Sequence, residues 1–268
     1  MNVVKGPEET DEVIVSLVGD LGVSIRGEPL AVPMMAARLI GFLAVHARPL
    51  RRSYVSGSLW PEVDERHAAA SLRTALWRVP SRHGTVLVCA TNSHLGLGSN
   101  VRVDLHEISR LAAALDGHGD PPLRWADVAH ALPGLSDDLL TGWYDDWAAA
   151  ERERFHQARL HLFDRIGEHL LLERRYGHAF EVGLALVRAE PLHESGHRII
   201  VRVHLEEGNI ADAFRCWELY AARLAREVGA TPSPAMAELL QPYRVRRGRR
   251  VASAPAAHGG WASPQRTV

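Results

Sequence analysis

The chain has 268 residues, of which 46% are hydrophobic and 24% charged, the composition of a globular protein with one large or two ordinary domains. No apolar run approaches the roughly 20 residues of a membrane-spanning helix, and the N-terminus lacks a signal-peptide pattern. Cys89 and Cys216, the two cysteines, form neither a disulfide framework nor a zinc pattern. These features argue against a membrane protein and a disulfide-rich secreted scaffold, and they favour the reducing cytoplasm.

The net charge of −1 conceals a basic stretch between Arg48 and Arg82. Seven arginines and three acidic residues give this stretch a net charge of +4. A local basic excess on a near-neutral protein is typical of a nucleic-acid footprint. A solvated helix face can have the same composition, so charge alone leaves both interpretations open.

Short β-rich runs open the chain. Residues 13–18 and 21–25 predict a hairpin around Gly19-Asp20, and a short strand is expected at 30–32. Pro33 then marks a position where a mostly buried helix can begin.

Two further helices follow, each with its own start and stop signals. Ser53 can cap a short helix that ends near Trp60. Asp64 can cap the next helix, which we expect to run to about Val79 because Pro80 cannot continue it. Residues 85–90 and 94–98 flank Thr91-Asn92-Ser93 and predict a second hairpin. Strands, three helices and a hairpin in this order predict a winged helix-turn-helix.

The remainder of the chain, from Val103 to Tyr243, is predicted to be almost entirely helical. Residues 116–133 contain Gly and Pro and are expected to form a loop and a short helix. Residues 151–174 predict one long amphipathic helix, whose charged start, Glu151 to Arg154, fits a solvated surface with local charge pairs. Its expected inner face comprises Phe155, Leu162, Phe163, Ile166 and Leu170.

A self-match with a period of 34 residues lies in this helical region. Ala179-Phe180 recurs as Ala213-Phe214, and Gly208-Asn209 predicts a tight turn between helices. A period of 34 residues is that of tetratricopeptide-type helix pairs, which stack and present a surface to other macromolecules. The fold class predicted is therefore mostly α with small β elements, a winged helix followed by an all-α tetratricopeptide-like domain.

Four segments follow from this organisation. They are a flexible N-terminus (1–12), a DNA-binding winged helix (13–102), a helical domain (103–243) and a basic, disordered tail (244–268).

The third helix, after Asp64, is the strongest candidate for a functional element. Its expected inner face comprises Ala69, Leu72, Leu76 and Val79. The residues expected to face base edges in the major groove are Arg73, Thr74, Trp77 and Arg78. For Trp77, packing against a neighbouring helix remains an equal alternative.

Other residues are expected to contact phosphates or to belong to the wing. They are Arg51, Arg52, Ser53, Arg66, Ser71, Asn92 and His94. The wing tip carries no Arg or Lys, so a plain turn explains it almost equally well.

His193-Glu194-Ser195-Gly196-His197 matches the H-E-x-x-H motif of zinc proteases. Its context is poor, because Gly196 lies inside it, Pro191 places it in the first turn of a helix, and no third ligand is clearly placed. P-loop, dinucleotide-binding and nucleophile-elbow motifs do not occur. We expect no catalytic site, no metal and no cofactor, and we keep a zinc hydrolase using His193 and His197 as a minor alternative.

Several long motifs resemble those of SARP-type transcriptional activators. In the N-terminal half the resemblance rests on SLWPEVDERHAAASLRTALWRV. In the C-terminal half it rests on LLTGWYDDWAAAERERF, AEPLHESGHRIIVRVHLEEGNIADAFRCWELY and LAREVGATPSP. The resemblance covers residues 13–243, and it places the His193 motif in a segment that usually reads Glu-Pro-Leu-x-Glu-Ser-x-His.

The resemblance implies an OmpR-type winged helix followed by a bacterial transcriptional activation domain. It implies a homodimer that binds promoter direct repeats in double-stranded DNA and recruits RNA polymerase holoenzyme, including the sigma factor. The regulated genes would be an antibiotic biosynthesis cluster, and the protein would be cytoplasmic and nucleoid-associated, without contact to a membrane. The alternative is a protein–protein adaptor with a degenerate winged helix.

One departure from the family pattern concerns the end of the third helix. Family members continue it with an Arg-rich segment, whereas this chain has Val79-Pro80-Ser81-Arg82. Pro80 should end the helix early and reposition Arg82. The wing tip also lacks the basic residue expected of the family.

Overall fold

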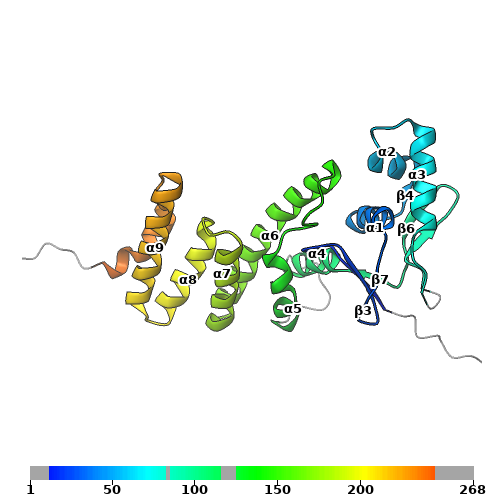
Figure 1. Ribbon diagram of the computed structural model, residues 1–268. Helices are drawn as coiled ribbons and strands as arrows, with labels where there is room; N and C mark the ends of the chain where they lie inside the picture. The colour runs from blue at the N-terminus through cyan, green and yellow to red at the C-terminus, as the bar shows by residue number, and fades with distance from the viewer. Residues whose placement is uncertain (1–11, 83–84, 116–124, 245–268) are drawn as a thin grey trace, which may run out of the picture.

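The computed structural model describes residues 12–82, 85–115 and 125–244. They form two halves, a winged-helix half and a helical half that extends away from it to one side (Figure 1). Residues 1–11 of the predicted flexible N-terminus and the predicted tail from residue 245 onward lie outside the described residues, as do residues 83–84 and 116–124.

A four-stranded sheet of order β3-β2-β1-β7 joins the first residues of the winged-helix half to its last. It comprises β1 (Val13–Ser16), β2 (Gly22–Ile25), β3 (Glu28–Pro29) and β7 (Val101–Val103). The first predicted hairpin is confirmed, because β1 and β2 are antiparallel, whereas β1 and β7 are parallel. Val13 and Val15 are fully buried while Ile14 between them is exposed, so one face of β1 covers the core.

The third strand lies earlier than the expected 30–32. Arg26 and Gly27 both have positive φ, at 53° and 81°. Two such residues make the tight type I′ turn, which brings the chain straight back onto β2. Ile25 therefore pairs with Glu28 and Ser24 with Pro29, and the Leu30 N–H donates to the Val23 carbonyl at 2.8 Å.

Three helices pack together above this sheet, α1 (Met34–His46), α2 (Arg52–Leu59) and α3 (Glu65–Trp77). Their shared core includes Leu39, Phe42, Leu59 and Leu72. The predicted Asp64 cap is confirmed, because its carboxylate accepts the backbone N–H of His67 at 3.0 Å.

The predicted Ser53 cap is wrong. Residues Leu50–Arg51 form a short strand, β4, and α2 begins directly after it at Arg52. Arg51 is thus the N-cap residue, without a side-chain bond, and Ser53 lies inside the first turn.

The wing is the second predicted hairpin, and it is confirmed. Antiparallel β5 (Val88–Ala90) and β6 (His94–Leu97) join β4 in a sheet of order β4-β6-β5. Pairing of β4 with β6 attaches the wing to the start of α2.

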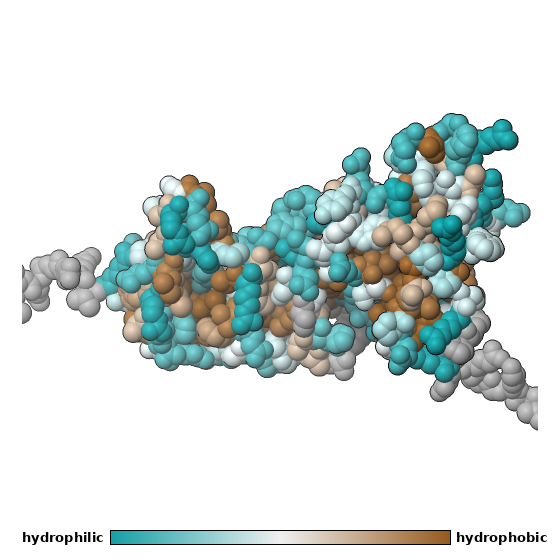
Figure 2. All heavy atoms as spheres, in the orientation of Figure 1, coloured by the Kyte–Doolittle hydropathy of each residue, from teal (hydrophilic) through white to brown (hydrophobic). Residues whose placement is uncertain are grey.

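The helical half begins at Asp104. Its elements are α4 (Asp104–Leu115), α5 (Trp125–Ser136), α6 (Asp146–Leu172), α7 (Tyr176–Ala189), α8 (Glu194–Glu206), α9 (Ile210–Val228), α10 (Pro234–Leu240) and a 3₁₀ turn, η1 (Gln241–Tyr243). Helices α6 to α9 lie side by side in chain order (Figure 1). In Figure 2 the outer part of the winged-helix half, around α2 and α3, is largely hydrophilic.

The long predicted helix is confirmed but begins five residues earlier, at Asp146 instead of Glu151. The earlier start has a physical reason, since Ala148 is fully buried and extends the inner face. The predicted inner residues are buried as well, including Phe163 and Ile166 at 0% exposure. The short helix expected within 116–133 is α5, which runs on to Ser136.

The 34-residue self-match falls on equivalent positions of two helices. Ala179 in α7 and Ala213 in α9 are both fully buried. The turn predicted at Gly208-Asn209 separates α8 from α9, and Gly208 has a φ of +78°. Because 34 residues separate the two alanines, each lies at the same place in its own helix pair.

Candidate nucleic-acid interface

Helix α3 turns a small-residue face inward. Ala68, Leu72 and Ala75 are buried at 2% exposure or less against α1 and α2. The predicted face had the right centre, Leu72, but it included Ala69 and Leu76 where the structure buries Ala68 and Ala75. Alanines at these two positions allow close helix packing, and each is followed directly by another apolar residue, so the apolar period alone does not distinguish them.

The opposite face of α3 carries Arg73, Thr74 and Trp77, all exposed. Trp77 is 85% exposed, which rejects the alternative that it packs against a neighbouring helix. Residues 73 and 77 are one helical turn apart and therefore share one face. Helix α3 lies on the side of the winged-helix half away from α7 to α9 (Figure 1).

The end of α3 differs from the prediction by two residues. The helix ends at Trp77, and Arg78 is its C-cap residue. Val79 precedes Pro80, and a residue before proline is disfavoured in the helical conformation. The Arg78 side chain is exposed, and its Nη1 lies 3.8 Å from the Met35 Sδ of α1.

Charge is distributed unevenly along α3. Asp64 and Glu65 stand at its N-terminus, where negative charge is favourable, and Arg73 and Arg78 stand toward its C-terminus. Hydrogen bonds from the His67 backbone and ring hold the pKa of the Asp64 carboxyl below its ordinary value. The C-terminal half of the exposed face is therefore positive.

Three further side chains of α3 differ in their exposure and hydrogen bonding. The Thr74 hydroxyl donates to the Ala70 carbonyl at 3.1 Å, so it is engaged within the helix. Arg66 is exposed in the first turn, whereas Ser71 is only partly exposed.

Arg51 and Ser53, at the start of α2, are exposed as a phosphate contact requires. Arg52 instead forms hydrogen bonds with the wing. Its guanidinium donates to the Thr91 carbonyl at 2.9 Å, and its backbone N–H donates to the Ser93 carbonyl at 2.9 Å. Arg52 thus fastens the turn of the wing to α2.

The wing tip is stabilised by its own short-range bonds. The Thr91 hydroxyl donates to the His94 carbonyl at 3.2 Å, and Ser93 Oγ lies 2.9 Å from His94 Nδ1. Asn92 is exposed, and His94 is partly buried.

Tyr54 is a surface residue that sequence reasoning missed. It is 50% exposed on α2, directly after Ser53, and its hydroxyl lies 3.5 Å from His46 Nε2. A phenol beside exposed Arg51 can donate to a phosphate. A tyrosine flanked by Arg51-Arg52-Ser53 was the available signal.

The residues of the H-E-x-x-H match have other partners. His193 is the N-cap residue of α8 and lies 3.8 Å from Asp164. The Glu194 carboxylate accepts the Ser233 N–H at 2.7 Å and the Ser233 hydroxyl. His197 Nε2 lies 3.0 Å from the Pro191 carbonyl, and its ring stacks on Tyr220. Among the described residues no group of three or more His, Cys, Asp or Glu side chains is placed to hold a metal ion.

Of the comparisons with known proteins, one matches the helical half and another matches most of the chain. The family model of the bacterial transcriptional activator domain matches residues 103–242. Among solved structures, Mycobacterium tuberculosis EmbR in complex with a low-affinity phosphopeptide is similar, with a TM-score of 0.56 and 18% sequence identity. The similarity covers 85% of this chain and 64% of EmbR, so the chain spans less than two thirds of EmbR's length. A likeness at this identity shows the fold, a winged helix followed by a helical domain.

No curated protein matches this chain significantly. None of the described helices is long and apolar enough to cross a membrane.

Proposed function

Because the chain belongs to the bacterial transcriptional activator domain family, as a SARP-type transcriptional activator, we propose that its winged-helix half binds promoter DNA and its helical half contacts RNA polymerase. The observation that carries the proposal is the exposure of Trp77 at 85% beside Arg73 on the outer face of α3. A recognition helix needs one buried face and one exposed face of this chemistry.

Each exposed residue of this surface has a role in the proposal. Arg73 donates to a guanine edge, and the Thr74 methyl and the Trp77 ring contact thymine methyls or sugars. Arg66 and Arg78 bind phosphates at the two ends of α3. Arg51, Ser53 and Tyr54 bind the phosphates beside α2, and Asn92 reaches the backbone from the wing. Arg52, Ser71 and His94 support this surface from beneath.

Membership of the family supports a set of proposed partners. A homodimer on direct repeats places two winged helices on one face of promoter DNA, and the helical halves contact the polymerase holoenzyme with its sigma factor. An antibiotic biosynthesis cluster is the proposed target, and the nucleoid is the proposed location.

Selection of binding sequences from random duplexes, followed by titration at several salt concentrations, tests the proposal. A DNA reader should lose affinity steeply as salt rises, because each neutralised phosphate releases counterions. Arg73→Ala and Trp77→Ala should weaken binding to the selected sequence. Arg215→Ala, an exposed arginine on α9, is the matched control and should leave binding unchanged.

An adaptor is the second candidate, since Arg52 is engaged in fastening the wing and the wing tip carries no Arg or Lys. An adaptor predicts no selected sequence and no salt-dependent DNA affinity. That result would reject the DNA-binding proposal.

A further inference from the structure

The segment 137–143, between α5 and α6, forms a backbone bridge between the two halves. Its residues bond to Leu17 and Gly19, which directly follow β1, as an added strand would. Three backbone bonds of 2.7 Å make the connection, from Leu140 N to Leu17 O, from Gly19 N to Asp138 O and from Thr141 N to Gly19 O. The side chains of Leu139 and Leu140 are buried at 1% and 0% exposure.

Arg152 of α6 donates hydrogen bonds to three backbone carbonyl groups of this segment. Its Nε donates to Leu139 O at 2.9 Å, and its Nη2 donates to Leu140 O at 2.7 Å and Trp143 O at 2.8 Å. The sequence prediction that Glu151 to Arg154 form a solvated surface is therefore wrong for Arg152. It is right for Arg154, which pairs with Glu151 at 2.8 Å. A planar guanidinium presents its donors in a fixed fork, which suits several fixed acceptors.

Arg159 lies two turns further along the same face of α6 and holds the start of the segment. It is 3% exposed. Its guanidinium donates to the Asp137 carbonyl at 2.7 Å, pairs with the Asp138 carboxylate at 3.1 Å, and donates to Glu190 after α7 at 3.0 Å. A charge this deeply buried is stable only when it is paired, and movement of the segment away from α6 would remove the Asp137 and Asp138 partners and leave Glu190 as its remaining carboxylate.

A second connection joins α6 directly to α1. Asp145, the N-cap residue of α6, pairs with Arg38 of α1. The Trp147 ring meets Phe42 edge-on, with 5.3 Å between ring centroids. Phe42 belongs to the same core as Leu72 of α3. Contacts therefore run without interruption from α6 through α1 to the recognition helix.

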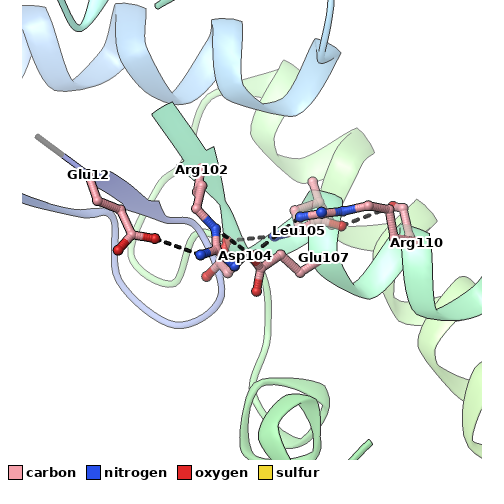
Figure 3. Close-up of polar contacts among 7 residues, drawn as sticks. Glu12, Arg102, Asp104, Leu105, Glu107 and Arg110 are labelled. Atoms are coloured by element: carbon pink, nitrogen blue, oxygen red, sulfur yellow. Dashed lines mark hydrogen bonds and ion pairs between the residues drawn. The ribbon is translucent and has the colours of Figure 1, made fainter. Parts of the chain in front are cut away.

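A third connection between the two halves lies at the chain junction between β7 and α4 (Figure 3), and we call these three connections together the seam. The Asp104 carboxylate accepts the N–H groups of Leu17 and Val18, each at 3.0 Å. Arg102 beside it pairs with Glu12 and Glu107.

We propose that Arg152 and Arg159 are positioning residues that fix α3 relative to the helical half, so that the chain acts on a promoter as one rigid body. The transcriptional consequence rests on the proposed function, whereas the rigidity is a property of the chain alone. A rigid activator holds its polymerase-contacting surface at one angle around the DNA. Inserting half a helical turn, about 5 base pairs, between its site and the promoter should abolish activation, and a full turn should restore part of it.

The distance between spin labels on the two halves tests the proposal without DNA. One label sits on Cys89, an exposed residue of β5, and the other on Leu172→Cys at the far end of α6, where Leu172 is 79% exposed. Cys216 is replaced by alanine to keep labelling specific. This protein should give a single narrow distance distribution. Arg152→Ala should broaden it, whereas Arg154→Ala, on the same helix but outside the seam, should not.

A broad distribution before any arginine is changed would overturn the proposal, and so would a narrow one in Arg152→Ala. If circular dichroism shows that Arg152→Ala does not fold, Arg152→Lys keeps the charge but cannot bond three carbonyls at once, and it should broaden the distribution as well. Failure to bind any promoter would reject the proposed function and leave the distance result unaffected. Intact DNA binding with a broad distribution would reject the rigid coupling alone.

Discussion

The Asp104 carboxylate accepts the backbone N–H of Leu17 at 3.0 Å across 87 residues of sequence. The same carboxylate accepts the N–H of Leu105 at 2.7 Å, at the start of α4. One side chain therefore satisfies N–H groups in the first turn of the helical half and in the residues directly after β1 together. Burial raises the pKa of the Asp104 carboxyl above its ordinary value, so its hydrogen bonds offset only part of the cost of the buried charge.

Asp104→Ala should destabilise the protein by about 1–3 kcal/mol, because it leaves backbone N–H groups at the seam without an acceptor. Urea denaturation followed by circular dichroism measures the change. Asp212→Ala removes a carboxylate from a surface pair on α9 and should cost less than about 1 kcal/mol. Equal effects of the two substitutions would show that the Asp104 bonds contribute nothing specific.

Arg73→Ala should weaken binding to the selected DNA by about 1–3 kcal/mol and relax the base preference at one position. Arg66→Ala, a proposed phosphate contact, should weaken binding to all sequences alike and reduce the salt dependence. Gel-shift titrations on matched and mismatched duplexes separate the two patterns. Unchanged affinity of Arg73→Ala would remove this residue from the interface.

Local signals in the sequence predicted the local structure well. The two hairpins follow from their turn residues, and the start of α3 follows from Asp64. The inner face of α6 follows from its apolar period. The short strand β3 was placed wrongly, since the pattern does not show that Arg26 and Gly27 adopt positive φ and start the pairing at Glu28.

The seam between the two halves could not be predicted from the sequence. Parallel pairing of β1 with β7 joins residues far apart in the chain, and no local pattern specifies such a partner. Arg152 and Arg154 belong to the same Glu-Arg-Glu-Arg run, yet the former turns inward to carbonyls and the latter to solvent. For the candidate interface, the outward face of α3 could be predicted from the sequence, whereas the exposure of Trp77 could not.

Gly98→Ala should destabilise the winged-helix half by about 1–3 kcal/mol. A Cβ at Gly98 would lie 1.9 Å from the Val86 carbonyl oxygen, so the backbone before β5 would have to move. Gly57→Ala is the matched control, because nothing lies within 4 Å of its added Cβ on α2. A helical Gly→Ala change at an open site should stabilise by up to about 1 kcal/mol. Thermal denaturation should therefore move in opposite directions for the two variants.

His197 should make stability depend on pH below neutrality. Burial against Tyr220 lowers the pKa of its imidazole below the ordinary 6.5, with a smaller contribution from Arg223, while the Pro191 carbonyl and Glu194 oppose the shift. The folded-state pKa thus lies below the unfolded-state one. The contribution of the neutral ring is fully present above pH 6.5 and is lost as the pH falls from there through the folded-state pKa.

Comparison of wild type with His197→Gln isolates this ring, because the other histidines are present in both proteins. The difference in free energy of unfolding should decrease by up to about 1.4 kcal/mol per pH unit between the two pKa values. Urea denaturation at intervals between pH 7.5 and pH 5 measures it. Parallel curves for the two proteins would mean that the pKa of His197 is the same in the folded and unfolded chain, which would contradict the pH dependence predicted from its packing between α8 and α9.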